Sequence, residues 1–393
     1  MRIVSFTAYC VRVPFRRKVT HASATRAESD NLLVQCKLAD GTEGWGEGVP
    51  RSYVTGETVG GAFEQLAGAK LESQTDRDCS SWEDVLDLCQ QLQFPSPIDD
   101  PRDCYGNALR CAIELSILDA YGRLFGEPVS AVTHHYGPAQ PVRASLDEVR
   151  YSGAITAEDP WRERISALKM RAYGFRHCKI KVAMPDVDDC QRLRTIRRWI
   201  GPRMDLRVDA NEGWHAEGLI EKLEPLLAYG ISCVEQPVPR REVEILADVR
   251  RQLPVAIMLD ESLTSILEAR NAIRLGTCDL FNIRLSKCGG FLNSLQLAGL
   301  ATKAGLGYQL GCHPGETGIL SAAGRHWATS VRDVVYLEGS YDRHLLQELP
   351  TNEDITFGFG GVAAALRAPG LGVTINHRVL ERLARKRKTY ACG

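Results

Sequence analysis

The sequence predicts an α/β protein in which a (β/α) barrel is joined to a smaller α+β capping domain. Three observations support this prediction. The chain has 393 residues, more than a single hydrophobic core usually serves. Its first segment, of about 50 residues, alternates apolar and polar side chains in the manner of an antiparallel meander. From about Pro141 onward, short β-branched runs alternate with helix-length amphipathic segments, which is typical of a parallel sheet built from βα units.

The N-terminal region has the pattern of a small mixed domain. Residues 3–9 and 32–38 alternate as strands do, and Asp40 with Gly41 supplies a turn between extended segments. Between about 59 and 124 the spacing becomes helical. It ends in an amphipathic segment, 108–125, that Gly126 terminates. We therefore expect an α+β capping domain over residues 1–135.

The central region, residues 136–345, contains eight candidate strands, and each but the last precedes a plausible helix. Eight βα units close a barrel, whose chemistry then lies at the C-terminal ends of the strands. The candidates are 149–155, 177–183, 205–210, 231–238, 255–260, 280–285, 307–312 and 334–337.

The C-terminal segment, residues 346–393, returns to short strands and turns at 355–358 and 372–375. Such strands would not extend a closed barrel, so we expect this segment to fold back on the capping domain. The basic run 385–388 is interpreted as a solvated terminus rather than a nucleic-acid site.

The composition excludes several classes of protein. Hydrophobic residues make up 44% and charged residues 25% of the chain, and the net charge is -1, which leaves no bulk field to attract nucleic acid or anionic membranes. No signal peptide and no apolar run of about 18 residues is visible. The 13 cysteines form no CxxC pair and are interpreted as reduced thiols. We expect a cytoplasmic homo-oligomer that binds a small-molecule carboxylate, and neither nucleic acid nor membrane.

Ionisable residues stand at the ends of seven consecutive candidate strands. They recur at intervals of 28, 26, 25, 27, 26 and 25 residues, about one βα unit each. This regularity predicts that all seven project into one ring above the barrel. The residues are Lys181, Asp209, Glu235, Asp260, Lys287, His313 and Glu338.

The ring contains three carboxylates on neighbouring strands. Asp209, Glu235 and Asp260 would repel one another unless a cation lies between them. Oxygen ligands favour a hard metal ion, Mg²⁺ best and Mn²⁺ next. The alternative interpretation is that the carboxylates form ion pairs with neighbouring lysines.

Two lysines face each other across the predicted ring. Lys181 and Lys287 belong to the second and sixth strands, so a carboxylate bound to the metal would present one face of its α-carbon to each. Lys179, two residues before Lys181, would help to lower the pKa of that base. Removal of the α-proton creates an enediolate, which a metal stabilises. The sequence therefore predicts metal-dependent proton abstraction next to a carboxylate.

Five motifs in this order resemble the enolase superfamily, in particular its muconate lactonizing enzyme subgroup. The resemblance covers nearly the whole chain and implies a modified, enolase-like TIM-type barrel whose α+β cap is completed by the C-terminal segment. The motifs are 178–181 (Cys-Lys-Ile-Lys), 208–211 (Val-Asp-Ala-Asn), 234–237 (Val-Glu-Gln-Pro), 259–262 (Leu-Asp-Glu-Ser) and 282–290, together with a helix at 113–122.

The resemblance also implies a role for each site residue. The implied metal ligands are Asp209, Glu235 and Asp260, and the implied acid–base pair is Lys181 and Lys287. Lys179 would contact a carboxylate or modulate a pKa, and Glu261 would support the metal ligands. The residues that would bind substrate are Asn211, His313 and Glu338. A lysine at 287 argues against the mandelate racemase subgroup. His313 either lines the substrate pocket or simply packs.

Substrate choice is expected to come from the cap loops 21–26 and 51–57, which would close over the barrel mouth. Segments 54–58 and 151–155 resemble dipeptide epimerases, but the Asp-x-Asp that such enzymes carry on the eighth strand is absent. Glu338 instead resembles the single glutamate of cycloisomerases.

These resemblances favour an epimerase or racemase of an amino-acid derivative or dipeptide. A muconate-type cycloisomerase, or a dehydratase of the acid-sugar or succinylbenzoate type, is the alternative. Two readings from other classes are a Schiff-base aldolase and a non-catalytic binding protein on the same fold.

Overall fold

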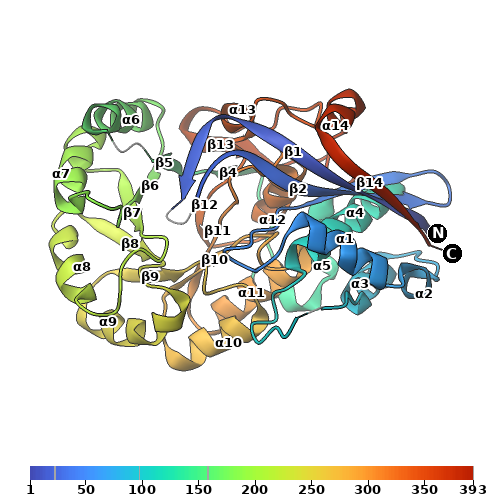
Figure 1. Cartoon of the computed structure of the whole chain (residues 1–393), viewed down its shortest axis with the longest axis horizontal. Coiled ribbons are helices and arrows are strands. Elements are labelled where there is room, and N and C mark those ends of the chain that lie inside the picture. Colours follow the sequence, from blue (N-terminus) through green and yellow to red (C-terminus); the bar gives the residue numbers. More distant parts are fainter. Residues whose placement is uncertain (22–23, 97, 157–158, 393) are drawn as a thin grey trace.

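The computed structural model describes residues 1–21, 24–96, 98–156 and 159–392. Figure 1 shows a barrel on one side and a capping region on the other, with both chain termini at the far end of the cap. We retain residues 1–135, 136–345 and 346–393 as the proposed limits of the cap, the barrel and the returning segment. Among the described residues, none of the helices is both long and apolar enough to cross a membrane.

The barrel is an eight-stranded sheet in the order β12-β11-β10-β9-β8-β7-β6-β5, in which all neighbouring strands are parallel. A hydrogen bond of 2.8 Å from Ser152 N to Leu337 O joins its two edges. The predicted (β/α) barrel fold is confirmed. Its strands are β5 (Gly153–Ile155), β6 (His177–Lys181), β7 (Asp205–Asp209), β8 (Ile231–Glu235), β9 (Ala256–Leu259), β10 (Leu280–Ile283), β11 (Gly307–Leu310) and β12 (Val334–Leu337).

Helices on the outside of the barrel follow the strands in alternation, as Figure 1 shows for its left side. They are α6 (Pro160–Ala172), α7 (Asp189–Ile200), α8 (Leu219–Leu227), α9 (Leu246–Gln252), α10 (Ile266–Leu275), α11 (Phe291–Lys303), α12 (Gly318–Ser330) and the short α13 (Asp342–Leu345).

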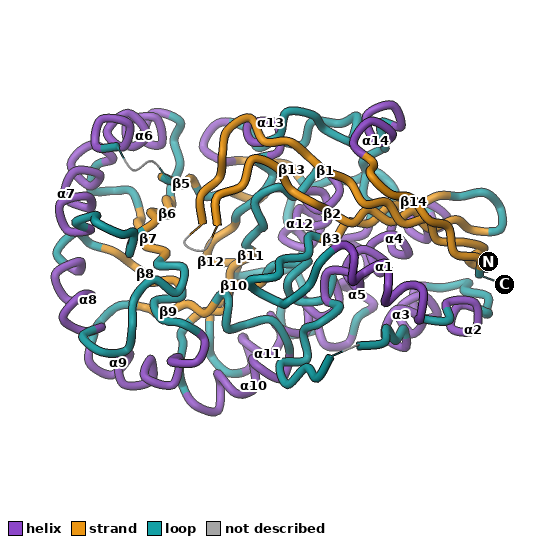
Figure 2. Tube along the Cα trace, in the orientation of Figure 1, coloured by secondary structure: helices purple, strands orange, loops and turns teal. Residues whose placement is uncertain are grey.

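The capping region combines an antiparallel sheet, ordered β14-β1-β2-β3, with a set of helices. The strands are β1 (Ile3–His21), β2 (Ala24–Leu38), β3 (Glu43–Gly48) and β14 (Ala384–Ala391). The helices are α1 (Val59–Gly68), α2 (Leu71–Thr75), α3 (Trp82–Gln91), α4 (Asn107–Phe125), α5 (Val132–His135) and α14 (His377–Leu383). Figure 2 shows β1 and β2 as one long hairpin that leaves this sheet and extends toward the barrel.

The first strand prediction, 149–155, was wrong as a single element. It divides into β4 (Glu148–Arg150) and β5, because residues 148–150 pair with β13 (Val362–Ala364) of the C-terminal segment instead of with the barrel. Tyr151 and Ser152 separate the two short strands. The C-terminal segment therefore braces the barrel as well as the cap.

The prediction of an amphipathic 108–125 segment was also wrong, because α4 is buried on all sides along most of its length. The cause is the small-residue face that β3 presents to it. A Cβ added at Gly46 would lie 1.9 Å from Ala112 O, and Cβ atoms added at Gly44 or Gly48 would lie 2.1 Å and 2.0 Å from α4 backbone atoms. Strand and helix backbones thus pack in direct contact, which only glycine permits.

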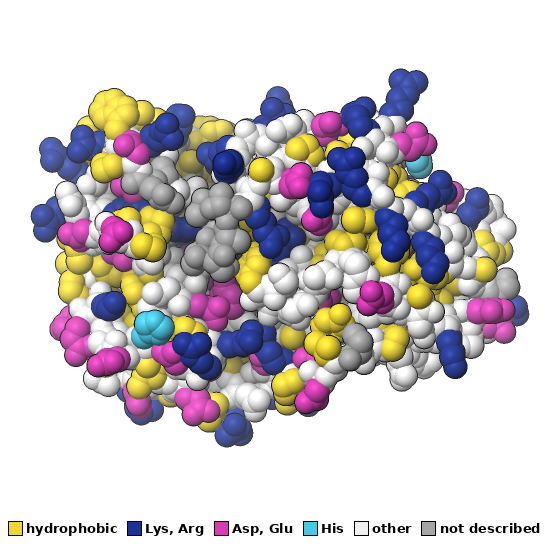
Figure 3. Space-filling view, in the orientation of Figure 1, with side chains coloured by type: hydrophobic (Ala, Val, Ile, Leu, Met, Phe, Trp, Pro, Cys, Tyr) yellow, Lys and Arg dark blue, Asp and Glu magenta, His cyan; other side chains and the backbone are white. Residues whose placement is uncertain are grey.

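The basic run 385–388 is part of β14, the edge strand that pairs with β1, and its side chains are exposed. Positive charge on an edge strand opposes pairing with a second sheet. Basic and acidic side chains are interspersed over the face of the molecule in Figure 3.

Buried carboxyl groups of the cap bind the N-termini of two barrel helices. Glu114 on α4 accepts hydrogen bonds from Phe291 N (2.5 Å) and Leu292 N (3.1 Å), the first residues of α11. Glu47 on β3 accepts from Thr317 N (3.0 Å) and Leu320 N (3.1 Å) at the start of α12. The free N–H groups of a helix's first turn and its dipole both favour such an acceptor. The cap therefore fixes the helices that follow β10 and β11.

Replacement of Glu114 tests this interface through pH. Burial raises the pKa of Glu114 from 4.5 to about 7, against the backbone hydrogen bonds that lower it. A carboxyl whose pKa is higher in the folded protein contributes stability below about 4.5, and that contribution is lost as pH rises through about 7. When the pH is raised from 5.5 to 8, the free energy of unfolding of the parent should therefore fall by on the order of 1–3 kcal/mol more than that of Glu114→Gln. Urea unfolding at the two pH values measures this difference.

The control is Glu114→Leu, which leaves the Phe291 and Leu292 N–H groups unpaired and should destabilise the protein at both pH values. Identical pH dependence in the parent and the Gln variant would show that Glu114 does not titrate in this range.

Candidate functional site

The ring predicted from the sequence begins with three strand ends in direct register. Lys181 of β6 pairs with Asp209 of β7, and Asp209 pairs with Glu235 of β8. Asp260 follows the last residue of β9, and Lys287 lies in the turn between β10 and α11. The parallel sheet thus brings these five side chains to one edge of the barrel.

Lys179 lies among three carboxylates. Its Nζ is 2.8 Å from Glu338 Oε1, 3.3 Å from Asp209 Oδ2 and 3.5 Å from Glu235 Oε2. Burial alone would lower the pKa of Lys179, but Glu235, Glu338 and Asp209 raise it well above its usual value. The neighbouring carboxylates therefore favour the charged form of Lys179 over the neutral form that a base requires.

Lys287 is fully buried and uses all three of its N–H donors. Its Nζ lies 2.7 Å from Asp260 Oδ1, 2.7 Å from Asp260 O and 2.8 Å from Asn282 O. A side chain held in this way can exchange a proton with a substrate only after one of these contacts opens.

Lys181 is partly buried, as is Lys179, whereas Lys287 is fully buried. Burial lowers its pKa, Asp209 opposes that effect, and the neighbouring charge of Lys179 adds to it. A lysine with a lowered pKa is suited to act as a base.

Two arginines that the sequence analysis did not single out belong to the same network. Arg207 on β7 donates a hydrogen bond of 2.5 Å to Glu338 Oε1. Arg284, which directly follows β10, pairs with Asp260 Oδ2 and lies 3.8 Å from Glu235 Oε1. The available signal was position: Arg207 and Asp209 are two residues apart on one strand and therefore point to the same side of the sheet.

Glu338 of the eighth strand end is neutralised by the two cations on either side of it. Burial alone would raise its pKa, but Lys179 and Arg207 lower it to about 2. Glu338 is therefore an anion whose charge is already satisfied within the protein.

Backbone strain and side-chain hydrogen bonds hold the strand ends in place. Asn211 (φ 44°) donates its N–H to Asp209 Oδ1 at 3.1 Å and its Nδ2 to Glu261 Oε1 at 3.3 Å. Gln236 (φ 36°) accepts a 2.9 Å hydrogen bond from Asp260 N and donates to Ser262 Oγ at 2.8 Å. Positive φ at a residue other than glycine needs support of this kind. Gln236 was missed by the sequence analysis.

His313 lies beyond β11 and is buried. Its backbone N–H donates to Glu316 Oε1 at 2.6 Å, and its Nδ1 lies 3.8 Å from the same oxygen. Burial raises the pKa of Glu316 to about 8.

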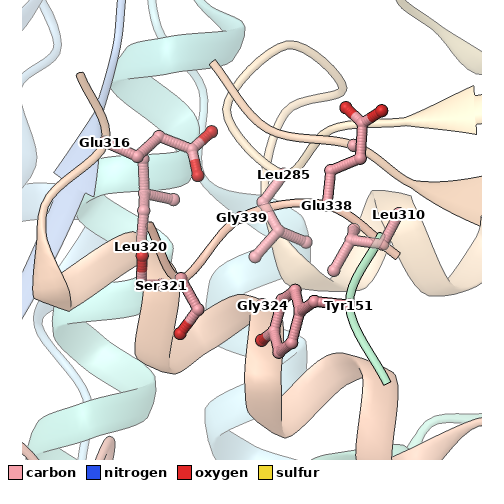
Figure 4. A pocket seen from close by; sticks show the side chains of 11 residues that line it. Tyr151, Leu285, Leu310, Glu316, Leu320, Ser321, Gly324, Glu338 and Gly339 are labelled. Carbon is pink, nitrogen blue, oxygen red and sulfur yellow. The ribbon is translucent and has the colours of Figure 1, made fainter. Parts of the chain in front are cut away.

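A narrow cavity runs between Glu316 and Glu338, whose side chains flank Leu285 in Figure 4. Its volume is about 10 Å³, which is room for about one water molecule. This cavity is therefore too small to enclose a substrate.

The cap segments named in the sequence analysis have different surroundings. In loop 21–26, residues 22–23 lie outside the described residues. The hairpin that carries them is attached beyond β12 by hydrogen bonds from Arg16 Nε to Leu346 O (2.7 Å) and from Gln347 N to Pro14 O (2.9 Å). Figure 1 shows this hairpin extending over the barrel.

Loop 51–57 is largely buried and is joined to the barrel by two arginines. Arg51 donates to Pro314 O at 2.8 Å. Arg102 donates to Val54 O at 2.7 Å and to Glu261 O at 2.6 Å, beside Asp260. This loop is therefore directly connected to the carboxylate side of the ring.

The fit of a divalent ion can be judged from these contacts. Within the described part of the chain, no three or more His, Cys, Asp or Glu side chains lie close enough together to coordinate a metal ion without rearrangement. Lysine and arginine side chains lie between the carboxylates instead, as the alternative interpretation expected. However, Glu235 Oε2 is buried and accepts no hydrogen bond from the described residues.

The state of Glu235 favours an additional cation. Burial, followed by the charge of Asp209, raises its pKa to about 8. An all-oxygen donor set of Asp209, Glu235 and Asp260 has the chemistry that Mg²⁺ prefers. The residues present therefore fit a hard divalent ion, with Lys179 and Arg284 as its competitors.

Comparison with known proteins identifies the family. Residues 162–379, more than half of the chain, match the model described as Enolase C-terminal domain-like. The chain is 30% identical over 315 residues to an aromatic dipeptide epimerase of Herpetosiphon aurantiacus, with 79% of this chain and 82% of that protein covered. It therefore belongs to the Enolase C-terminal domain-like family, and the predicted membership of the enolase superfamily is confirmed.

Two further relatives match over nearly their whole length. The N-succinyl-L-Arg/Lys racemase of Bacillus cereus is 26% identical over 386 residues, 98% of each chain. Its crystal structure superimposes with a TM-score of 0.86 and covers 99% of this chain and 100% of its own. The structure of a dipeptide epimerase of Enterococcus faecalis, complexed with Mg and L-Leu-L-Tyr, superimposes with a TM-score of 0.82 at 25% sequence identity. The match covers 95% of this chain and 100% of that one. These relatives are isomerases, as the predicted enzyme class requires.

Two carboxylates of the site should respond differently to neutralisation in metal-free protein. Asp260→Asn leaves the buried Lys287 and Arg284 without their anion and should lower the free energy of unfolding by about 3 kcal/mol. Glu235→Gln removes a charge that the site already disfavours, and should change it by less than about 1 kcal/mol. Urea unfolding in excess chelator at pH 7 measures both. Equal stability of the two variants would contradict the ion-pair network described above.

Proposed function

We propose that the chain is a divalent-metal-dependent epimerase or racemase that moves the proton next to the carboxylate of an amino-acid derivative or dipeptide. One observation carries this proposal. Lys181 ends β6 and Lys287 follows β10, four strands apart in an eight-stranded sheet, with Asp209, Glu235 and Asp260 on the strands between them. Two amines on opposite sides of one carbon are what inversion at that carbon requires.

Asp209, Glu235 and Asp260 are the residues that would hold the ion, Mg²⁺ first and Mn²⁺ as the alternative. When bound, the ion would neutralise the negative charge that grows on the substrate carboxylate as the proton leaves. The all-oxygen donor set and the buried Glu235 Oε2 without a hydrogen bond support this assignment, as does the Mg reported with the Enterococcus faecalis dipeptide epimerase.

The protein's own residues divide the remaining work. Lys181, whose pKa burial lowers, takes the proton from one face of the α-carbon or returns it there. Lys287 does the same on the other face after releasing one of its three acceptors. Lys179 keeps Glu338 in place and supplies fixed positive charge beside Asp209. Asn211 and Glu261 hold the carboxylate side of the site in position.

The state of Glu338 favours an N-acylated amino acid over a dipeptide with a free amino group. Lys179 and Arg207 already satisfy the charge of Glu338, so this carboxylate is poorly placed to hold a substrate ammonium group. The similarity to the Bacillus cereus N-succinyl-L-Arg/Lys racemase supports the same choice. Incubation with N-acylamino acids, dipeptides and other carboxylic acids in deuterated water, followed by mass spectrometry, identifies the substrate.

The other readings have less support. A cycloisomerase is favoured by the single glutamate on the eighth strand and by similarity to the muconate cycloisomerase 1 of Rhodococcus opacus, which is 26% identical over 388 residues. A Schiff-base mechanism needs an accessible amine; Lys287 is buried and saturated with hydrogen bonds, which leaves Lys181 as the candidate of the two, and such a mechanism would not use the three carboxylates beside it. A binding protein without activity would have no need of two opposed lysines.

The protein is further proposed to act as a homo-oligomer. Helix α6 exposes Trp161 (65%), Ile165 and Leu168 on one side, at a helical spacing. Exposed apolar stripes of this kind are commonly covered by another chain. Light scattering at micromolar concentration measures the mass directly, and a monomeric mass would rule the proposal out.

Lysine variants test the two-base mechanism. In Lys181→Met, the rate of deuterium exchange at the α-carbon of one enantiomer should fall at least about 100-fold, whereas slow exchange from the other enantiomer should remain. Lys287→Met should have the opposite preference, and the double variant should exchange neither. In a cycloisomerase or dehydratase only one of the two lysines would exchange the proton.

Exchange is followed by proton NMR on separate enantiomers in deuterated buffer. Equal circular dichroism spectra and metal affinities of the variants exclude a loss of folding or of the ion. Wild-type exchange in both single variants would show that neither lysine is a base.

A further inference from the structure

Arg284 occupies the space between two of the carboxylates assigned to the ion. It is 8% exposed, and it stands directly after β10, three residues before Lys287. Its Nη2 pairs with Asp260 Oδ2 and lies 3.8 Å from Glu235 Oε1. Asp260 is therefore in contact with two cations, because Lys287 Nζ is bound to its other oxygen at 2.7 Å.

An ion that binds Asp260 must compete with this guanidinium. Arginine cannot lose its charge in a protein, so it cannot avoid repulsion by releasing a proton. The repulsion between a guanidinium and a divalent ion is strong in a site from which water is excluded. Binding of the ion thus requires Arg284 to give up at least part of its contact with Asp260.

Arg284 also has a donor that the protein leaves unused. Its Nε is buried and has no hydrogen-bond acceptor among the described residues. Buried donors without an acceptor are rare, and one in a functional site calls for an explanation. A carboxylate is the natural partner, because it can accept two parallel hydrogen bonds from the edge of a guanidinium.

We propose that Arg284 changes partners during the working cycle: it neutralises Asp260 in the metal-free protein and binds the substrate carboxylate once the ion holds Asp260. This inference rests on the proposed function. It makes Arg284 an anion-binding residue of the site, and it orders the events, since the guanidinium becomes available to the carboxylate only after the ion has bound. The ion and the carboxylate ligand should therefore bind cooperatively.

Ion binding tests the first half of the proposal without any substrate. Arg284→Gln removes the competitor, so calorimetric titration of the metal-free full chain with Mg²⁺ should give a Kd at least about 10-fold lower than the parent's. Arg284→Lys keeps a positive charge and should remain close to the parent. The matched control is Arg251→Gln, which removes an exposed arginine paired with Asp248 on α9, and should leave the affinity unchanged.

Carboxylate binding tests the second half. Oxalate is the probe, because it is a planar dicarboxylate and its binding does not depend on the identity of the substrate. Oxalate should bind the Mg²⁺-loaded parent at least about 10-fold more tightly than Mg²⁺-loaded Arg284→Gln, although that variant binds the ion better. It should bind the metal-free parent weakly, because Arg284 is then engaged with Asp260.

The outcomes separate this inference from the proposed function. If the parent binds no Mg²⁺, the metal-dependent function itself is wrong. If the parent binds Mg²⁺ but Arg284→Gln binds it equally or less tightly, the competition is overturned. If the ion affinity rises while oxalate affinity does not fall, Arg284 is not the carboxylate partner. Should the Gln variant fail to fold by circular dichroism, Arg284→Met is titrated in the same way, with the same criteria.

Discussion

Burial of acidic side chains at the ends of parallel strands is the constraint on which the site depends. A parallel barrel brings consecutive strand ends together, and Asp209, Glu235 and Asp260 therefore lie side by side away from water. Such a group is stable only if cations accompany it. In this protein Lys179 and Arg284 supply the charge from within the same sheet, so the site is electrostatically complete as a protein structure while retaining an oxygen donor for a further ion.

The sequence predicted those features that depend on regular spacing. The intervals between strand-end residues predicted the register of Lys181, Asp209 and Glu235, because one βα unit separates neighbours in a parallel sheet. It could not predict which side chains meet across the barrel. Arg207 reaches Glu338 from a strand 131 residues away in the chain, and no local pattern records such a contact.

The two wrong predictions have the same physical origin. The 149–155 run has the composition of one strand, but its first half pairs with β13. Helix α4 was expected to have one exposed face, but the glycines of β3 allow a second backbone to cover that face. Tertiary partners overrode a local preference in each case, and the buried Glu47 and Glu114 were unrecognisable for that reason.

The pairing of β14 with β1 has a consequence for how the protein is made. β1 lies between β2 and β14 in the sheet, and nearly the whole chain separates β1 from its second neighbour. During synthesis β1 and β2 can pair at once, whereas the other side of β1 stays open until residues 384–391 have left the ribosome. An open strand edge is a template for association with other chains. The nascent cap thus carries one open strand edge until synthesis is nearly complete, and the strand pairing that completes the cap also covers this edge.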